Sequence, residues 1–183
     1  MSKTPDDVPE AAGDPTGRLD RALVQLAPVK RALVRASGRA AARVRSCDGC
    51  PAKCCRAGLN SMKITRIEAE ALRRRLVGPD LAPLVPEILR RAEAEVARRG
   101  LKDGPSATYD CPLLSPTGRC LVHGPAQPAG CLTFRPVPDG GCDHDLPLFH
   151  RKEPEIARAE RAAWGRLAPV LSIPEALLRL FRR

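Results

Sequence analysis

Eight cysteines are the residues of this chain whose type and spacing point most directly to chemistry. Four lie within nine residues and four follow at wider intervals: Cys47, Cys50, Cys54, Cys55, Cys111, Cys120, Cys131 and Cys142. A thiolate is a soft ligand that selects zinc and iron–sulfur clusters. Two residues separate Cys47 from Cys50, a spacing that lets both sulfurs reach one metal, as in zinc ribbons and iron–sulfur loops. We therefore predict that all eight cysteines are metal ligands.

Two other roles compete with metal ligation for these cysteines. Disulfides suit an even count, but they are rare in the reducing cytosol, and adjacent Cys54 and Cys55 could close only a strained ring. Free cysteines also pack as small buried hydrophobes, although four within nine residues is not a pattern of ordinary core filling. In extended backbone the doublet would send its sulfurs to opposite sides, which suits a polynuclear cluster. The predicted cofactor is an iron–sulfur cluster or zinc, with the cluster favoured.

The three histidines are weaker candidates, because a single histidine is more often a surface or structural residue than a ligand. His144 is the strongest of them, since Asp143 and Asp145 could orient its ring beside Cys142. An exposed acidic turn explains the same residues equally well. His123 and His150 have no such neighbours in their favour.

The order and spacing of the cysteines resemble those of the YkgJ-type cysteine-cluster proteins. The resemblance covers about residues 47–142 and is carried by Cys47-x2-Cys50-x3-Cys54-Cys55, Ile64-Thr65 with a Glu three residues on, Cys111-Pro112-Leu113, Gly118-x-Cys120, Pro128-x2-Cys131 and Cys142. These proteins are described as zinc- or iron-chelating domains or as iron–sulfur proteins. The resemblance therefore implies a metal-binding protein, without naming its cellular role.

An enzymatic role is the alternative that the same resemblance implies. The cysteine pattern is similar to that of flagellin lysine methylases, which implies protein modification by methyl transfer. The chain carries no glycine-rich phosphate loop, GxGxxG or HExxH motif, and its CxxCxxxC order reverses the CxxxCxxC of radical-SAM enzymes. The sequence thus contains no catalytic motif that we can identify.

Arginines form a second feature with functional meaning. Arg31, Arg35, Arg39 and Arg43 recur every four residues, in a chain of net charge +10. Arginine binds phosphate through its planar fork. The functional interpretation is contact with an acidic partner, or with nucleic acid if a zinc module positions this row of arginines. An ordinary solvated helix face is the stronger explanation, because no aromatic side chain stands among the arginines to stack on bases.

The elements that position the cysteines are predicted to be mainly helices. Only five residues are aromatic, so burial energy is scarce and a metal would help to hold the fold together. We predict a mainly α fold, with a small α+β arrangement as the alternative, whose helices pack around an irregular, cysteine-rich, metal-stapled centre. Capping boxes at Thr65/Glu68 and Ser172/Glu175 predict helices that start there.

Four segments follow from the distribution of Pro, Gly and apolar residues. We predict a disordered tail over residues 1–17, basic helices over 18–46 that break or kink at Pro28, a cysteine-cluster domain over 47–150 and C-terminal helices over 151–183. Within the cluster domain, helices are expected at 66–76 and 84–99, and a strand within 59–64. No secretory signal and no membrane-spanning run is recognisable, which predicts a cytoplasmic protein without membrane contact.

Overall fold

Five α-helices make up most of the described chain, which confirms the predicted mainly α fold. The computed structural model describes residues 15–41, 52–99, 108–136 and 142–182. The helices are α1 (Pro15–Ala41), α2 (Arg66–Leu76), α3 (Val85–Arg99), α4 (Leu146–Trp164) and α5 (Ile173–Phe181). The strands are β1 (Lys63–Ile64), β2 (Phe134–Pro136), β3 (Cys142–His144) and β4 (Leu171–Ser172). None of the helices in the described part is long and apolar enough to cross a membrane.

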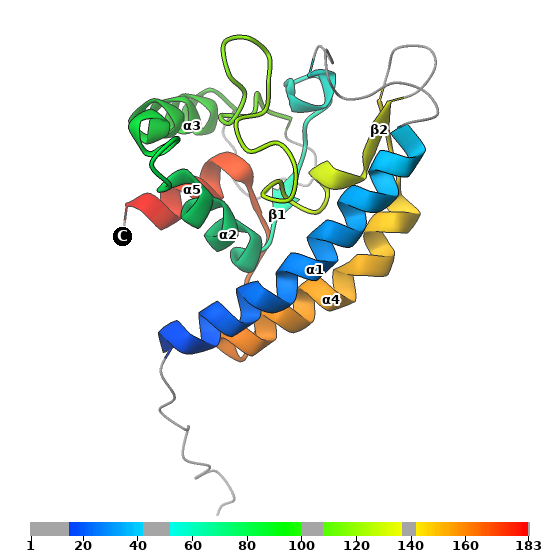
Figure 1. Ribbon diagram of the computed structural model, residues 1–183. Coiled ribbons are helices and arrows are strands. Elements are labelled where there is room, and N and C mark those ends of the chain that lie inside the picture. Colours follow the sequence, from blue (N-terminus) through cyan, green and yellow to red (C-terminus); the bar gives the residue numbers. More distant parts are fainter. Residues whose placement is uncertain (1–14, 42–51, 100–107, 137–141, 183) are drawn as a thin grey trace, which may run out of the picture.

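Helices α1 and α4 lie side by side as one long antiparallel pair (Figure 1). Their shared core consists of aliphatic side chains spaced three and four residues apart, the period that puts them on one helix face. Leu26 and Leu33 from α1 meet Ile156 and Ala159 from α4, and each is at most 2% exposed. Ile67 of α2 also packs into this core.

The predicted break at Pro28 is wrong, because α1 continues through it. Proline removes the hydrogen bond to the carbonyl of Val24, four residues earlier. Pro28 and Val24 are both exposed, so water can hydrogen-bond that carbonyl instead. Burial of Leu26 and Val29 on the opposite side then holds the helix together. The helix also begins at Pro15, inside the segment predicted to be a disordered tail.

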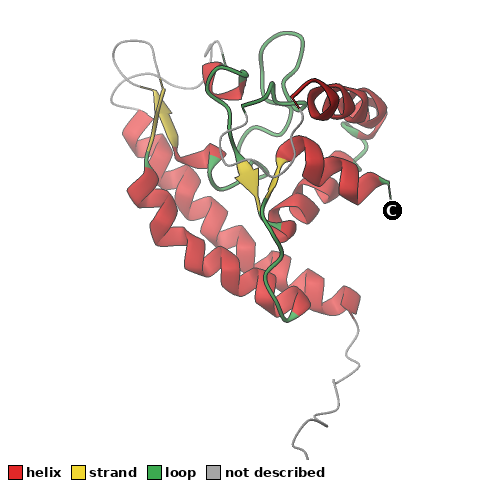
Figure 2. Ribbon diagram, turned by 180° about the vertical axis from the view of Figure 1, so that it is seen from behind, coloured by secondary structure: helices red, strands yellow, loops and turns green. Residues whose placement is uncertain are grey.

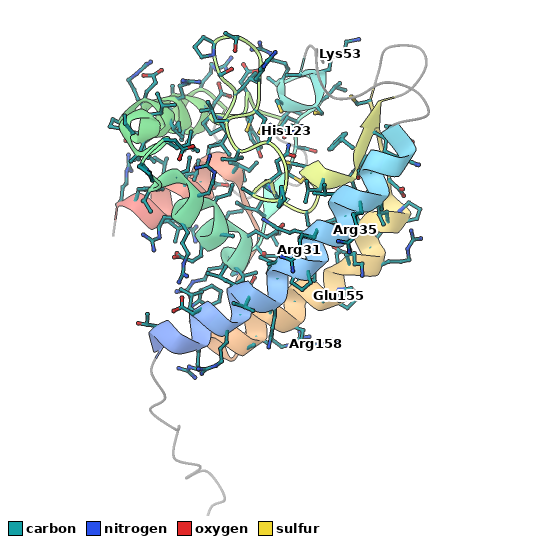
Figure 3. All side chains as sticks on the ribbon, viewed as in Figure 1. Arg31, Arg35, Lys53, His123, Glu155 and Arg158 are labelled. Atoms are coloured by element: carbon teal, nitrogen blue, oxygen red, sulfur yellow. The ribbon has the colours of Figure 1, made fainter. Side chains whose placement is uncertain are left out.

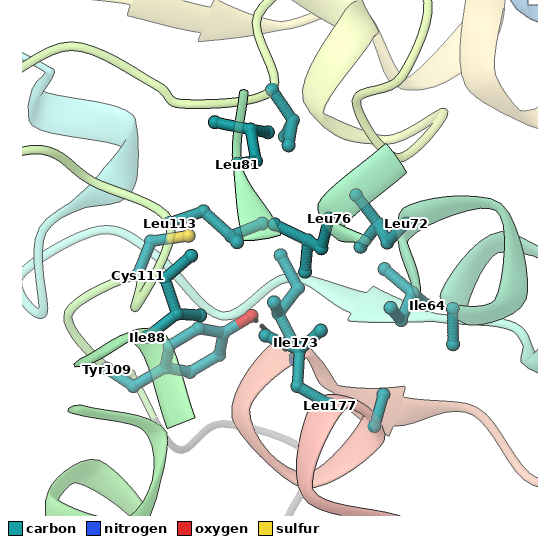
Figure 4. Close-up of a cluster of buried hydrophobic side chains, with 13 residues drawn as sticks. Ile64, Leu72, Leu76, Leu81, Ile88, Tyr109, Cys111, Leu113, Ile173 and Leu177 are labelled. Carbon is teal, nitrogen blue, oxygen red and sulfur yellow. Dashed lines mark hydrogen bonds between the residues drawn. The ribbon is translucent and has the colours of Figure 1, made fainter. Parts of the chain in front are cut away.

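Helices α2, α3 and α5 surround a second core (Figure 4). Strands β1 and β4 form a short antiparallel ribbon, with Lys63 opposite Ser172, and each strand leads directly into a helix. Both predicted capping boxes are present, Thr65 with Glu68 at α2 and Ser172 with Glu175 at α5. The ribbon therefore fixes the starting points of α2 and α5 next to each other.

The chain between Thr108 and Asp145 is largely irregular where the structure describes it (Figure 2). It contains the 3-10 helix η3 (Cys131–Thr133) and a hairpin in which β2 pairs with β3, Phe134 opposite His144. Asp145 then caps α4 by accepting from the backbone N–H of Leu148 at 3.0 Å. Helix α4 consequently starts before the predicted C-terminal segment at 151 and continues through Pro154.

Candidate metal centre

The six cysteines in the described part of the chain come from five separate places. Cys54 and Cys55 end the 3-10 helix η1 (Lys53–Cys55), Cys131 opens η3 and Cys142 opens β3. Cys111 and Cys120 lie in the irregular stretch that follows α3. All six are free thiols. The two remaining predicted ligands, Cys47 and Cys50, lie outside the described residues.

Four of these thiols lie close enough to shift one another's pKa. Cys55 and Cys142 act on the pKa of Cys54, and Cys111 and Cys54 act on that of Cys55. The backbone supports the proximity of Cys111 and Cys55, because the N–H of Cys111 donates to the carbonyl of Cys55 at 2.8 Å. Segments almost ninety residues apart in sequence (54 and 142) therefore bring their sulfurs together.

Cys120 and Cys131 lie close enough to the same sulfurs to interact with them electrostatically. The charge of Cys120 raises the pKa of Cys55. The pKa of Cys131 is raised by Cys55, Cys120 and Cys54. Cys55, Cys120 and Cys131 also pack on the core cluster that contains Cys111 (Figure 4). The structure thus gathers all six described cysteines in one neighbourhood.

The surroundings of these thiols favour their protonated form. The hydrogen bond to Cys111 is the main cause that raises the pKa of Cys55 from 9.0 to about 12. The hydrogen bond to Cys55 raises the pKa of Cys54 in the same direction, and removal from water raises that of Cys120. Part of Cys131 stays accessible, yet desolvation raises its thiol pKa well above the usual value. Without a cation, these sulfurs are neutral thiols at pH 7.

Tight turns place the sulfurs. Ala52, directly before η1, has a left-handed backbone (φ 56°), which is uncommon for a residue with a Cβ and costs about 1 kcal/mol. Gly118 (φ 77°) allows the turn at Ser115–Gly118 that brings Cys120 back to an isolated bridge with Leu114. The Gln127 amide then donates to the Cys120 sulfur at 3.8 Å.

Two buried charged residues hold the segment that leads to Cys131, and sequence reasoning missed both as parts of the site. Glu68 accepts from the N–H of Ala129 at 2.7 Å while it completes the capping box at Thr65. Lys30 of α1 donates to the carbonyl of Ala126 at 3.4 Å and is 3% exposed. A signal for Lys30 did exist, because it falls within the buried stripe formed by Leu26, Val29 and Leu33.

Tyr109 supports the site from the core. Its hydroxyl donates to the carbonyl of Met62 and accepts from the N–H of Ile173 at 3.2 Å (Figure 4). Desolvation raises its pKa well above 10.0, and the sulfurs of Cys111, Cys131 and Cys55 act in the same direction. A neutral tyrosine therefore links the cysteine region to the ribbon and α5.

His144 and His150 take part in other contacts. His144 stacks on Phe134 with ring centroids 4.5 Å apart and shares a hydrogen bond with Thr133 at 2.8 Å. Desolvation lowers its pKa, so the ring is neutral and serves in packing. His150 pairs with Glu153 on the surface of α4. His123 is exposed near the cysteine loops (Figure 3).

The donor set fits a thiophilic metal by its chemistry. Zinc ions and iron–sulfur clusters are bound by several soft sulfur ligands. Within the described ranges, no group of three or more His, Cys, Asp or Glu side chains is already arranged around a point that could hold a metal ion. Metal binding would therefore require these thiols to lose protons and turn towards a common centre.

Comparisons with known proteins add no relative. The resemblance to YkgJ-type proteins therefore depends on the order and spacing of the cysteines alone. No protein-family model, curated protein or solved structure matches this chain.

Proposed function

We propose that this chain is a metal-binding protein whose eight cysteines hold an iron–sulfur cluster or zinc. The observation that carries the proposal is the convergence of the six described cysteines from five places in the chain, where they act on one another's pKa values and four of them belong to or pack on one core. Thiols gathered in this way become a thiolate site once a cation replaces their protons. Cys47 and Cys50 precede η1 in the sequence and would complete the set.

The pKa values of the thiols support metal binding over nucleophilic catalysis. A reactive cysteine needs a lowered pKa, from a nearby cation or a helix N-terminus. Here the pKa values of Cys54, Cys55, Cys120 and Cys131 are raised. A metal ion supplies the positive charge that such crowded thiols need in order to ionise. The cofactor would therefore also serve as the staple of this region.

Anaerobic purification of the full chain tests the proposal. We expect bound iron with labile sulfide and a broad visible absorption band, or one or two zinc ions in a colourless protein. As a control, thiol alkylation under native conditions should be slow in the loaded protein and fast after a chelator removes the metal. A protein with neither metal, whose eight thiols all react freely, would sink the proposal.

A second function, contact with nucleic acid, is favoured by the outer face of α1 and α4. Arg31 and Arg35 on α1 and Arg158 on α4 lie on the same side of the helix pair (Figure 3). Among the described residues these three make no ion pair, whereas the arginines at 73, 74, 75, 90, 91 and 98 do. The side chains of Arg39 and Arg43, the rest of the predicted ridge, are not among those described.

Salt dependence distinguishes this second function from a solvated helix face. Binding of duplex DNA should weaken with added salt, and the double variant Arg31→Ala/Arg35→Ala should reduce the slope of log affinity against log salt by about 2. Arg90→Ala, which removes an arginine paired with Glu87, is the matched control and should leave the slope unchanged. Equal slopes for wild type and double variant would exclude this surface.

A further inference from the structure

Two charged side chains on α3 contact the cysteine-bearing loop. Glu95 is 7% exposed, and its carboxylate accepts from the backbone N–H of Asp110 at 3.0 Å. One turn earlier, the Arg91 guanidinium donates to the carbonyl of Leu114. Residues four apart lie on the same face of a helix. Helix α3 therefore holds the short segment that contains Cys111 at both of its ends.

The side chain of Asp110 connects this segment to a second one. One of its carboxylate oxygens accepts from the N–H of Ala57 at 2.9 Å, two residues after Cys55. The other oxygen lies 3.3 Å from the guanidinium of Arg98, which also donates to Glu95. A backbone N–H makes a stronger hydrogen bond to a carboxylate than to a neutral oxygen. Asp110 thus ties the residues that follow η1 to α3.

These bonds place two cysteine-bearing segments next to each other. The N–H of Cys111 donates to the carbonyl of Cys55 at 2.8 Å. At the other end, the N–H of Tyr109 donates to the carbonyl of Asn60 at 2.9 Å. The bond made by the Asp110 carboxylate falls between these two. Cys111 belongs to the core around α2, α3 and α5, and Cys55 packs against that core. Both cysteines therefore reach the same core from adjacent segments.

We propose that Asp110 is a positioning residue of the metal centre and keeps Cys55 and Cys111 side by side as ligands of that centre. This inference rests on the proposed metal-binding function. Glu95 and Arg98 act with Asp110, because they hold its backbone and its carboxylate. Hydrogen-bonding groups behind metal ligands orient those ligands, and their removal lowers metal affinity by about 10- to 100-fold.

Asp110→Ala tests this role, because it removes the acceptor of the Ala57 N–H and leaves all the cysteines in the chain. Zinc affinity of the full-length reduced protein, measured by competition with a chromogenic chelator, should fall about tenfold. Asp110→Asn keeps an oxygen that can accept from Ala57 and should retain more affinity. The matched control is Asp80→Ala, which removes an exposed carboxylate paired with Arg75 and should bind zinc like wild type.

Alkylation followed by mass spectrometry distinguishes positioning from general support of the fold. In the zinc-loaded Asp110→Ala variant, alkylation should accelerate at Cys55 and Cys111 more than at Cys120 and Cys131. The Tm of the metal-free variant should fall by no more than about 4 °C, because partly exposed ion pairs contribute little to stability. If the wild type is isolated with iron, the rate of iron loss to a chelator replaces zinc affinity, and the same order of variants is expected.

The outcomes separate this inference from the proposed function. If the wild type binds zinc and Asp110→Ala binds it equally well, Asp110 does not position the ligands. If Asp110→Ala lowers the metal-free Tm by much more than Asp80→Ala and exposes the four cysteines alike, Asp110 only supports the fold. Either result overturns the inference while the proposed function stands. A wild type that holds neither zinc nor iron overturns the proposed function, and this inference with it.

Discussion

The two cores of this protein are built from different materials. The core between α1 and α4 contains Leu, Ile, Val and Ala at helical spacing, and no described cysteine belongs to it. The core around α2, α3 and α5 contains Cys111 and has Cys55, Cys120 and Cys131 packed against it. Helices supply most of the first core, together with Ala129 and Leu132 near Cys131, whereas irregular chain supplies a larger share of the second.

This difference indicates that helix packing stabilises the α1–α4 core more fully than the cysteine-bearing core. A helix satisfies its own backbone groups, and its apolar face needs only another helix to cover it. The stretch from Tyr109 to Cys131 has turns, an isolated bridge and η3 in place of such repeats. We therefore expect metal loss to affect the cysteine-bearing core first and the α1–α4 core last.

Metal removal should have the largest effect and should divide the two regions. Structural thiolate sites contribute on the order of 10 kcal/mol in small zinc domains. After chelation under reducing conditions, hydrogen exchange should accelerate in residues 109–131 and stay slow in Leu26–Leu33 and in Ile156–Ala163. Uniform acceleration throughout the chain would show that the two cores form one cooperative unit.

The metal-free protein should also lose stability as pH rises. The folded pKa of Cys55 lies at about 12, above its usual 9.0, so the folded state keeps a proton that the unfolded chain releases. The stability from this group is complete below pH 9 and is lost as pH rises towards 12. Urea unfolding at pH 8 and pH 10 checks this, and a metal-free protein that gains stability over that interval would contradict it.

Replacing one fully buried leucine in each core by alanine should compare the two cores at a similar loss of stability. Leu33 and Leu177 are both 0% exposed, Leu33 in the α1–α4 core and Leu177 in the cysteine-bearing core. Replacing either with Ala should lower the free energy of unfolding by about 2–5 kcal/mol. Only Leu177→Ala should also reduce the metal retained against a chelator. Equal metal loss in both variants would mean that the difference between the cores is not functional.

Tyr109→Phe should have a smaller effect, confined to the cysteine-bearing core. The change leaves the N–H of Ile173 without its acceptor, a buried group whose desolvation costs about 1–3 kcal/mol. Chemical denaturation measures the loss. An unchanged free energy of unfolding would show that another group satisfies the Ile173 N–H.

The two capping boxes offer the finest comparison. Ser172→Ala and Thr65→Ala should each cost about 1 kcal/mol. Glu68 of the Thr65 box also accepts from Ala129 in the cysteine loop, whereas Glu175 bonds only to Ser172 among the described residues. Thr65→Ala should therefore lower metal retention and Ser172→Ala should not. If Ser172→Ala lowered metal retention and Thr65→Ala did not, α5 rather than α2 would support the cysteine-bearing loop.

Local rules were enough to predict α2 and the start of α5, because each begins at a capping box. They failed at Pro28, where tertiary burial on one side of the helix outweighs one missing hydrogen bond. The pairing of α1 with α4 was also beyond local rules, since it joins segments more than a hundred residues apart.

The candidate site divides in the same way. Cysteines are recognisable by type and spacing, so the six described ones could be singled out before any fold was known. Lys30 and Glu68 were not singled out as parts of the site, because their contacts with the cysteine-bearing loop and their burial to 3% and 4% exposure depend on tertiary packing. Their role depends on which loop α1 and α2 cover.

The order in which these parts are synthesised gives the β1–β4 ribbon a further meaning. On a ribosome, β1 and every cysteine emerge before β4 and α5, yet Ile173 and Leu177 belong to the core that supports the sulfurs. The β1–β4 pairing and the bond from the Ile173 N–H to Tyr109 must therefore wait until the last described strand and helix have emerged. In the proposed metal-binding function, metal insertion into the finished site would then follow translation, and until then the nascent thiols would depend on their surroundings to remain reduced.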